Sequence, residues 1–137
     1  EGNPPCQPGS GPYQPGDLYA LTKAFQEQIA PQYWELHGLA TTILRPAWIV
    51  YDDDFRTKYG ERVTRYAPSL IDPRDIGRAV LAALELPDPK LEAFELGQDD
   101  APEPAAPARR RLRWRAQYRF VKLRTGSPPT TPLPSPR

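Results

Sequence analysis

The apolar side chains between residues 17 and 38 recur every three or four positions, which is the spacing of one face of an α-helix. This pattern predicts a helix that begins at Asp17, whose carboxylate suits the N-cap, and ends at Gly38. Pro31 lies inside the pattern and lacks a backbone N–H, so we expect a kink or a break near Ala30. The apolar stripe consists of Leu18, Leu21, Phe25, Ile29, Tyr33 and Leu36.

Three later segments predict strands and a second helix. The stretch LATTILRPAWIVY (39–51) is rich in β-branched residues without polar alternation, which is typical of a strand covered on both faces in a parallel sheet. Pro46 should end its ladder. SLIDPRDIGRAVLAALELPDP (69–89) predicts a short strand and then a helix capped by Asp72, and LEAFELG (91–97) predicts another strand. The second helix should bury a stripe formed by Ile76, Val80 and Leu84.

Composition divides the chain into three parts. It contains 19 prolines, crowded at both ends, and its hydrophobic fraction is 39%, below the roughly 45–50% of ordinary globular chains. We therefore predict a Pro/Gly-rich loop over residues 1–16 and a foldable α/β domain over residues 17–98. Residues 99–137 are expected to form a disordered Pro/Arg-rich tail.

The charge distribution sets this tail apart. All 17 acidic side chains lie in residues 1–103, whereas residues 104–137 are basic. Between Arg111 and Phe120, arginines alternate with apolar residues, a period of two that fits a strand with one cationic face. Such a face could contact nucleic acid or another anionic surface, which would make the chain a non-catalytic binding protein. We favour the disordered tail, because no nucleic-acid-binding fold accompanies the charge.

Several classes of protein are excluded or disfavoured. No apolar run reaches the roughly 18 residues that cross a bilayer, so no membrane span is predicted. The single Cys6 forms no internal disulfide and has no metal-ligand spacing to His37, so we expect a cytoplasmic protein without a metal site. The chain contains no methionine, from which we expect it to be a fragment of a longer protein.

Tyr19 and Lys23 are the residues most suggestive of chemistry. They are four positions apart, so a helix places the phenol beside the ammonium group. A phenol with a pKa near about 10 exchanges protons poorly at neutral pH, and a nearby positive charge lowers that pKa towards a useful range. The same spacing is common on helices without a catalytic role, so the pair alone establishes no site.

An ordered set of segments gives this pair its context. Tyr-x-x-x-Lys early in a long helix is followed by HGLATTILRP, then LIDPRDIGRAVLAALELP, then FELG. This order resembles the C-terminal half of the extended short-chain dehydrogenase/reductases, the NAD-dependent epimerase/dehydratase family. The resemblance covers roughly residues 13–98. It implies a partial Rossmann-like parallel sheet with flanking helices that lacks the N-terminal nucleotide-binding half.

The resemblance also implies a function and roles for six residues. The function is that of an NAD(P)-dependent oxidoreductase of the epimerase, dehydratase or reductase type, acting on a sugar nucleotide or a similar hydroxyl or carbonyl substrate. A homodimer of the parent protein through the first helix is a further implication. The implied roles are acid/base for Tyr19, tuning of that tyrosine and contact with the nicotinamide ribose for Lys23, cofactor contact for Pro46, Ala47 and Ile49, and substrate contact for Trp48.

The sequence departs from the family pattern at the cofactor site. The Gly-rich turn that binds the pyrophosphate, G-x-x-G-x-x-G, occurs nowhere in the chain. We therefore expect the chain to be the catalytic-helix half of its parent and to be inactive by itself. Asp52 stands where many members have glycine, and the family's catalytic serine or threonine is not assigned.

Overall fold

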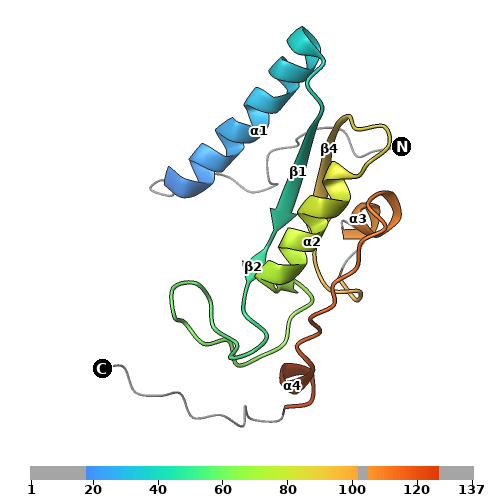
Figure 1. The fold of residues 1–137 in the computed structure, drawn as a ribbon. Helices are drawn as coiled ribbons and strands as arrows, with labels where there is room; N and C mark the ends of the chain where they lie inside the picture. Colours follow the sequence, from blue (N-terminus) through green and yellow to red (C-terminus); the bar gives the residue numbers. More distant parts are fainter. Residues whose placement is uncertain (1–17, 102–104, 127–137) are drawn as a thin grey trace.

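A computed structural model describes residues 18–101 and 105–126. Long helices lie beside a narrow sheet, and short helices lie near the end of the described chain (Figure 1). In chain order the elements are α1 (Leu18–His37), β1 (Thr41–Pro46), β2 (Trp48–Ile49), β3 (Leu70–Ile71), α2 (Pro73–Leu84), β4 (Leu91–Leu96), α3 (Ala106–Arg111) and α4 (Val121–Arg124).

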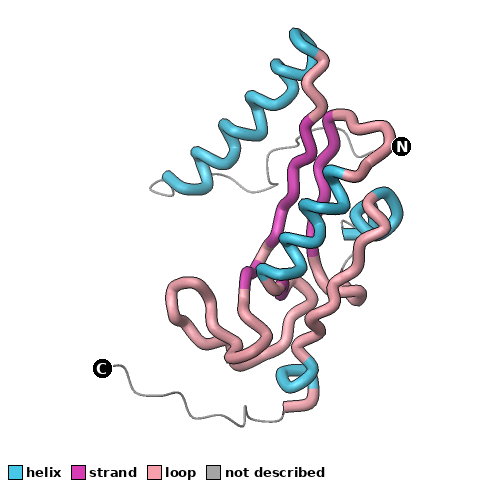
Figure 2. The backbone as a smooth tube through the Cα atoms, viewed as in Figure 1, coloured by secondary structure: helices cyan, strands magenta, loops and turns pink. Residues whose placement is uncertain are grey.

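The strands pair in parallel. β1 and β4 run side by side with Thr41 opposite Leu91 and Pro46 opposite Leu96, and β2 pairs in parallel with β3 (Figure 2). Helix α1 contacts both β1 and β4, α2 contacts β1, and α3 contacts β4. The predicted α/β class, with a partial Rossmann-like parallel sheet and flanking helices, is confirmed. Pro46 is the last residue of β1, as its missing N–H predicted.

Helix α1 ends where the sequence predicted. Gly38 adopts φ 64°, a left-handed conformation that glycine tolerates, and its N–H donates to the Trp34 carbonyl at 2.8 Å. The predicted break near Ala30 is absent, because the helix continues through Pro31 to His37. The proposed N-cap, Asp17, lies outside the described residues. Over the part of the chain that the structure describes, neither α1 nor any other helix combines the length and the apolar character that a bilayer crossing needs.

The apolar stripe of α1 faces outward. None of the twenty residues of α1 is buried, and Phe25 and Leu36 are 58% and 73% exposed. The side of the helix opposite most of this stripe is only half-buried. The half-buried residues of α1 are Ala20, Leu21, Ala24, Glu27, Ala30, Pro31 and Trp34. The predicted stripe is thus exposed at every position except Leu21, which is half-buried.

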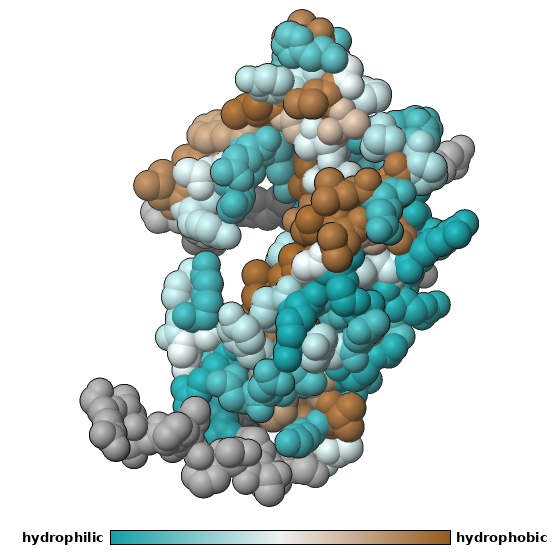
Figure 3. Space-filling model, in the orientation of Figure 1, coloured by the Kyte–Doolittle hydropathy of each residue, from teal (hydrophilic) through white to brown (hydrophobic). Residues whose placement is uncertain are grey.

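Helix α2 begins as predicted and packs differently. Asp72 is its N-cap, and its carboxylate accepts a hydrogen bond from the Arg74 N–H at 2.9 Å. The predicted buried stripe is wrong at two positions, because Val80 is 43% and Leu84 is 78% exposed. The buried positions are instead Asp75 and Ala79. Figure 3 shows the resulting apolar surface over α2.

Residues 105–126 are folded, which corrects the predicted disordered tail. The apolar side chains of the alternating segment are buried, and the arginines between them point away from the core. The buried residues are Ala105, Ala106, Ala108, Leu112, Trp114, Ala116 and Phe120. The alternation thus correctly separated the two faces, although the segment from 112 to 120 pairs with no strand among the described residues. Residues 127–137 and 1–17 lie outside the described residues.

A buried carboxylate fastens this C-terminal segment to α2. The Asp75 carboxylate accepts hydrogen bonds from the backbone N–H groups of Gln117 and Tyr118, both at 3.0 Å, and pairs with the Arg78 guanidinium. The indole N–H of Trp114 donates to the Asp75 carbonyl at 3.0 Å. Because buried carboxylates require such partners, these contacts explain why a charged residue occupies the core face of α2.

The core consists of two clusters. The first joins β3, α2 and β4 to the C-terminal segment through Phe94, Leu96, Leu112 and Trp114. The second comprises Val50, Phe55, Leu70 and Phe120, with Val63, Tyr66, Ala67 and Leu123 packed against it. The C-terminal segment contributes to both clusters, so it is an integral part of the fold.

Three aspartates surround Arg74 at the start of α2. The Asp72 carboxylate is fully buried and accepts the Asp52 N–H at 2.9 Å, while Arg74 pairs with Asp72 at 2.7 Å and with Asp53 at 3.1 Å. Burial would raise the pKa of Asp72, but the hydrogen bonds from Arg74 and Asp52 outweigh it and hold that pKa below its usual value. Burial, followed by the charges of Asp72 and Asp53, raises the pKa of Asp52.

We predict that replacing Asp52 by asparagine stabilises the protein at neutral pH. A carboxyl whose pKa is higher in the folded state favours folding at low pH, and that contribution is lost as the pH rises through the folded pKa. The amide keeps an acceptor oxygen without the charge, so we expect a gain of up to about 1 kcal/mol at pH 7, given the partial exposure of the site. The gain should shrink as the pH falls towards about 4, near the ordinary carboxyl pKa. Thermal melts across this range measure it.

Asp53 provides the control for this prediction. Its side chain is 72% exposed and is ion-paired with Arg74, so Asp53→Asn removes an attraction rather than a repulsion. We expect Asp53→Asn to leave the melting temperature unchanged or slightly lower. An equal gain in both variants, or a gain from Asp52→Asn that persists unchanged at low pH, would contradict the assignment of charge repulsion to Asp52.

Candidate active site

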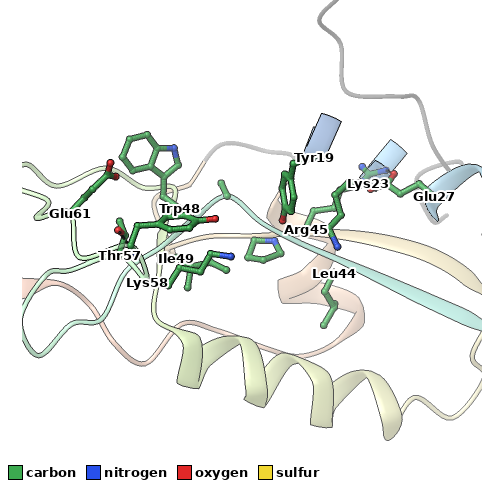
Figure 4. A pocket seen from close by; sticks show the side chains of 13 residues that line it. Tyr19, Lys23, Glu27, Leu44, Arg45, Trp48, Ile49, Thr57, Lys58 and Glu61 are labelled. Carbon is green, nitrogen blue, oxygen red and sulfur yellow. Dashed lines mark hydrogen bonds and ion pairs between the residues drawn. The ribbon is translucent and has the colours of Figure 1, made fainter. Parts of the chain in front are cut away.

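A cavity of about 650 Å³ lies between α1, the junction of β1 and β2, and a hairpin at residues 56–62 (Figure 4). It lies at the carboxyl end of β1, the edge at which parallel sheets of this type bind ligands. Its volume is in the range of small-molecule sites. All six residues singled out from the sequence line it: Tyr19, Lys23, Pro46, Ala47, Trp48 and Ile49.

Tyr19 and Lys23 lie together on the α1 side of the cavity. The Lys23 ammonium nitrogen is 5.6 Å from the centroid of the Tyr19 ring and donates a hydrogen bond to the Gln26 side chain at 3.2 Å. Tyr19 is 67% exposed, and its ring reaches from the helix into the cavity (Figure 4). The two groups therefore share one open site, where a bound molecule can contact both.

An ion-pair network holds α1 against the sheet beside this pair. Arg45 of β1 binds both carboxylate oxygens of Glu27, at 3.0 and 2.6 Å, and also binds Glu95 of β4 at 3.1 Å. These bonds raise the pKa of Arg45 above its usual value, although burial opposes the shift. Two carboxylates compensate one guanidinium here, so Arg45 serves to position α1 rather than to bind an anion.

The hairpin at residues 56–62 forms a wall of the cavity that was not predicted from the sequence. Thr57, Lys58, Tyr59 and Glu61 line the cavity from the hairpin. They lie on a turn in the loop between β2 and β3, and the chain around them carries no catalytic motif. Gly60, which adopts φ 83° in that turn, is the residue type in the sequence that could have indicated it.

Lys58 lies across the cavity from Tyr19. Its ammonium group points into the space that Tyr19 enters (Figure 4) and lies 4.9 Å from the centroid of the Tyr59 ring. The neighbouring Tyr59 hydroxyl raises the pKa of Lys58. Lys58 is therefore a cation at neutral pH and adds positive charge to the side of the cavity opposite Lys23.

The arginines of the C-terminal segment are largely engaged within the molecule. Arg111 pairs with Glu92 at 2.9 Å, Arg119 with Asp99 at 2.7 Å, and Arg124 with Asp100 at 3.0 Å. These ion pairs compensate the positive charge of arginines that, from the sequence, could have contacted nucleic acid.

Over residues 18–101 and 105–126, no cluster of three or more histidine, cysteine, aspartate or glutamate side chains is arranged to hold a metal ion.

Comparison with known proteins relates part of this chain to part of a dehydrogenase. No protein-family model and no solved structure matches the chain. An L-arabinose 1-dehydrogenase (NAD(P)(+)) from Haloferax volcanii is 31% identical over 96 residues, which are 66% of this chain and 38% of that enzyme. The chain thus spans well under half the length of this curated relative. It is similar to one part of an NAD(P)-dependent oxidoreductase.

Proposed function

We propose that this chain carries the proton-transfer side of an NAD(P)-dependent oxidoreductase site. One observation supports this most strongly: Tyr19 and Lys23 share a single cavity with the Pro46–Ile49 segment. The similarity to an NAD(P)-dependent dehydrogenase supports the same class of chemistry. Neither Tyr19 nor Lys23 is needed for packing, since both are exposed on a helix that buries no residue.

In this proposal Tyr19 exchanges a proton with the reacting oxygen of the substrate. For oxidation of an alcohol, the phenolate oxygen accepts the hydroxyl proton, and the carbonyl product keeps the oxygen. The Lys23 ammonium group lies 5.6 Å from the centroid of the Tyr19 ring, beside the proposed proton-transfer group. NAD or NADP would supply the hydride acceptor. In the reverse direction Tyr19 donates the proton to the carbonyl oxygen.

The residues present fit the nicotinamide end of such a cofactor. Pro46, Ala47 and Ile49 provide a largely apolar wall beside Tyr19, suited to a flat ring, and Lys23 is placed to bond a ribose hydroxyl. The sequence offers no Gly-rich turn for the pyrophosphate. We therefore propose that the adenosine and pyrophosphate contacts come from elsewhere in a longer protein, and that this chain by itself binds only the nicotinamide portion.

The substrate proposed for the site is a sugar or a sugar nucleotide. Trp48 at the mouth of the cavity is 60% exposed and offers an aromatic face for a sugar ring, and Tyr59 offers another from the hairpin. The relative named above is an arabinose dehydrogenase, which supports a neutral sugar. Epimerisation and dehydration are alternative net reactions of the same Tyr/Lys arrangement in the family that the sequence resembles.

The outward stripe of α1 supports a second copy of the protein as partner. Leu18, Phe25, Ile29 and Leu36 are each more than half exposed and lie in one row along the helix. Covering such a row on a partner helix would remove this apolar surface from water. We propose a homodimer of the parent protein through this face.

The direct test is to locate ligand binding on the purified chain by two-dimensional NMR. The probe is reduced nicotinamide mononucleotide, added alone and then with L-arabinose. We expect saturable shift changes at the amides of Lys23, Ala47 and Ile49. Absence of changes there, or changes confined to the arginines of the C-terminal segment, would contradict the proposal. The second outcome, together with a salt-sensitive response to an oligonucleotide, would support the anion-binding alternative instead.

A further inference from the structure

The hairpin at residues 56–62 lacks an anchor at its tip. Its two arms pair through Arg56 and Arg62, and its turn is closed by Thr57 N–H to the Glu61 carbonyl and Gly60 N–H to the Thr57 carbonyl, both at 2.9 Å. At the tip, Lys58 and Gly60 are exposed, and Tyr59 is 76% exposed. The position of this cavity wall must therefore be set at the base of the hairpin.

The base is formed by a residue in an unusual conformation. Phe55 is 1% exposed and adopts φ 59°, the left-handed region that a bulky side chain rarely enters. Its N–H donates to the Tyr51 carbonyl at 2.8 Å, and its carbonyl accepts the Val63 N–H at 2.8 Å. The direction in which the hairpin leaves the core thus depends on Phe55 being held in this conformation.

Phe120 packs in the same small cluster and adopts the same conformation. It is fully buried, has φ 52°, and shares a cluster with Val50, Phe55 and Leu70. Its backbone lies beside the Asp52 carboxyl group, three residues before Phe55, and acts to lower the pKa of that group against the larger effect of burial. Such backbone conformations persist only where surrounding contacts overdetermine them, and they concentrate near functional sites. Both aromatic rings are buried in this one cluster.

The C-terminal segment that carries Phe120 is itself firmly held. Just before Phe120, the backbone N–H groups of Gln117 and Tyr118 are bound by the buried Asp75 carboxylate, and the Arg74 guanidinium lies 3.8 Å from the Tyr118 ring centroid. The position of Phe120 is therefore fixed by these contacts, and a loop that packs beside Phe120 can be held in place by it. From outside the hairpin, its base is held by the bridge between Val50 and Thr57 and by the cluster that contains Phe55 and Phe120.

We propose that Phe120 is a positioning residue for the cavity, which holds the hairpin at residues 56–62 in place from the C-terminal segment through the packing of Phe55. Phe120 does not line the cavity and acts through Phe55. The consequence for ligand binding rests on the proposed function, whereas the effect on the hairpin does not. The hairpin wall, with Lys58 and Tyr59, is thereby coupled to a segment more than fifty residues away in the sequence.

Amide hydrogen exchange on the full chain tests this inference. In Phe120→Ala we expect the amides of Thr57, Gly60 and Val63 to exchange at least about tenfold faster relative to the amides of β1, because the hairpin opens locally while the β1–β4 ladder stays closed. Phe120→Leu keeps an apolar side chain at the site and should restore most of the protection. It also serves as the reporter if Phe120→Ala does not fold.

Leu112→Ala is the matched control. Leu112 belongs to the same segment and is 5% exposed, but it packs in the first core cluster, away from the hairpin base. We expect it to speed exchange of hairpin and β1 amides by the same factor. If Phe120→Ala shows that same uniform effect, or leaves the hairpin amides unchanged, the inference is overturned.

A ligand arm separates this inference from the proposed function. Titration with reduced nicotinamide mononucleotide should give a weaker dissociation constant in Phe120→Ala than in Leu112→Ala. If the hairpin amides lose protection selectively but no variant binds the probe, the positioning role stands and the proposed function fails.

Discussion

Replacing Tyr19 by phenylalanine is expected to lower NAD(P)-dependent turnover by about 10²–10⁴-fold, the usual contribution of a positioned proton donor or acceptor. The assay monitors nicotinamide absorbance in the longest natural polypeptide that contains this chain, with L-arabinose and related sugars as substrates. The substitution removes one oxygen from a side chain that is 67% exposed, so the melting temperature should not change. The loss should appear in kcat as well as in kcat/KM, because the proton moves only in the reaction.

Tyr33→Phe is the control on the same helix. Tyr33 is 51% exposed, lies near His37, and does not line the cavity, so its hydroxyl has no part in the proposed chemistry. We expect this variant to keep full activity. Turnover of Tyr19→Phe within about twofold of the parent would remove Tyr19 from the acid/base role, since so small a factor corresponds to less than half a kcal/mol.

The local signals of the sequence predicted the elements and the position of the cavity well. Capping chemistry placed the end of α1 at Gly38 and the start of α2 at Asp72, and the β-branched run predicted β1 as a parallel strand. These features are determined by residues within a few positions of one another. The family resemblance brought Tyr19 and the segment from Pro46 to Ile49 to one site, and the cavity contains both.

Packing partners distant in the sequence were the part that could not be predicted. The periodicity of α1 showed that Phe25 and Ile29 share a face, but a repeat of apolar positions does not say which surface covers them. The same holds for Val80 and Leu84 on α2. Most residues of both stripes are exposed in the described part of the chain.

The C-terminal segment was misjudged for a related reason. Its arginines suggested a solvated tail because their acidic partners, including Glu92 and Asp99, lie outside the segment. Trp114 and Phe120 belong to an alternating pattern that is visible in the sequence. The segment that carries them is bound to α2 by Asp75, which lies some forty residues earlier in the sequence. The segment is therefore basic, as its sequence shows, but the inference from this charge that it is disordered was wrong for residues 105–126.

Trp114 offers the most sensitive test that this segment is part of the core. Trp114→Ala is expected to lower the free energy of unfolding by about 3–5 kcal/mol, because it leaves a large cavity in the first core cluster and removes the indole N–H that bonds the Asp75 carbonyl. Small domains are stable by only about 5–15 kcal/mol, so much of the cooperative transition should be lost. Urea unfolding followed by far-ultraviolet circular dichroism measures the change without relying on tryptophan fluorescence.

Trp48→Ala is the matched control for this large truncation. Trp48 is 60% exposed at the mouth of the cavity, whereas Trp114 is 4% exposed, so the two variants remove the same side chain from opposite environments. We expect Trp48→Ala to change the free energy of unfolding by no more than about 0.5 kcal/mol, as for other surface positions. Equal, small effects of the two substitutions would show that residues 105–126 dock only loosely. The hairpin beside the cavity would then lose the anchor on which its position depends.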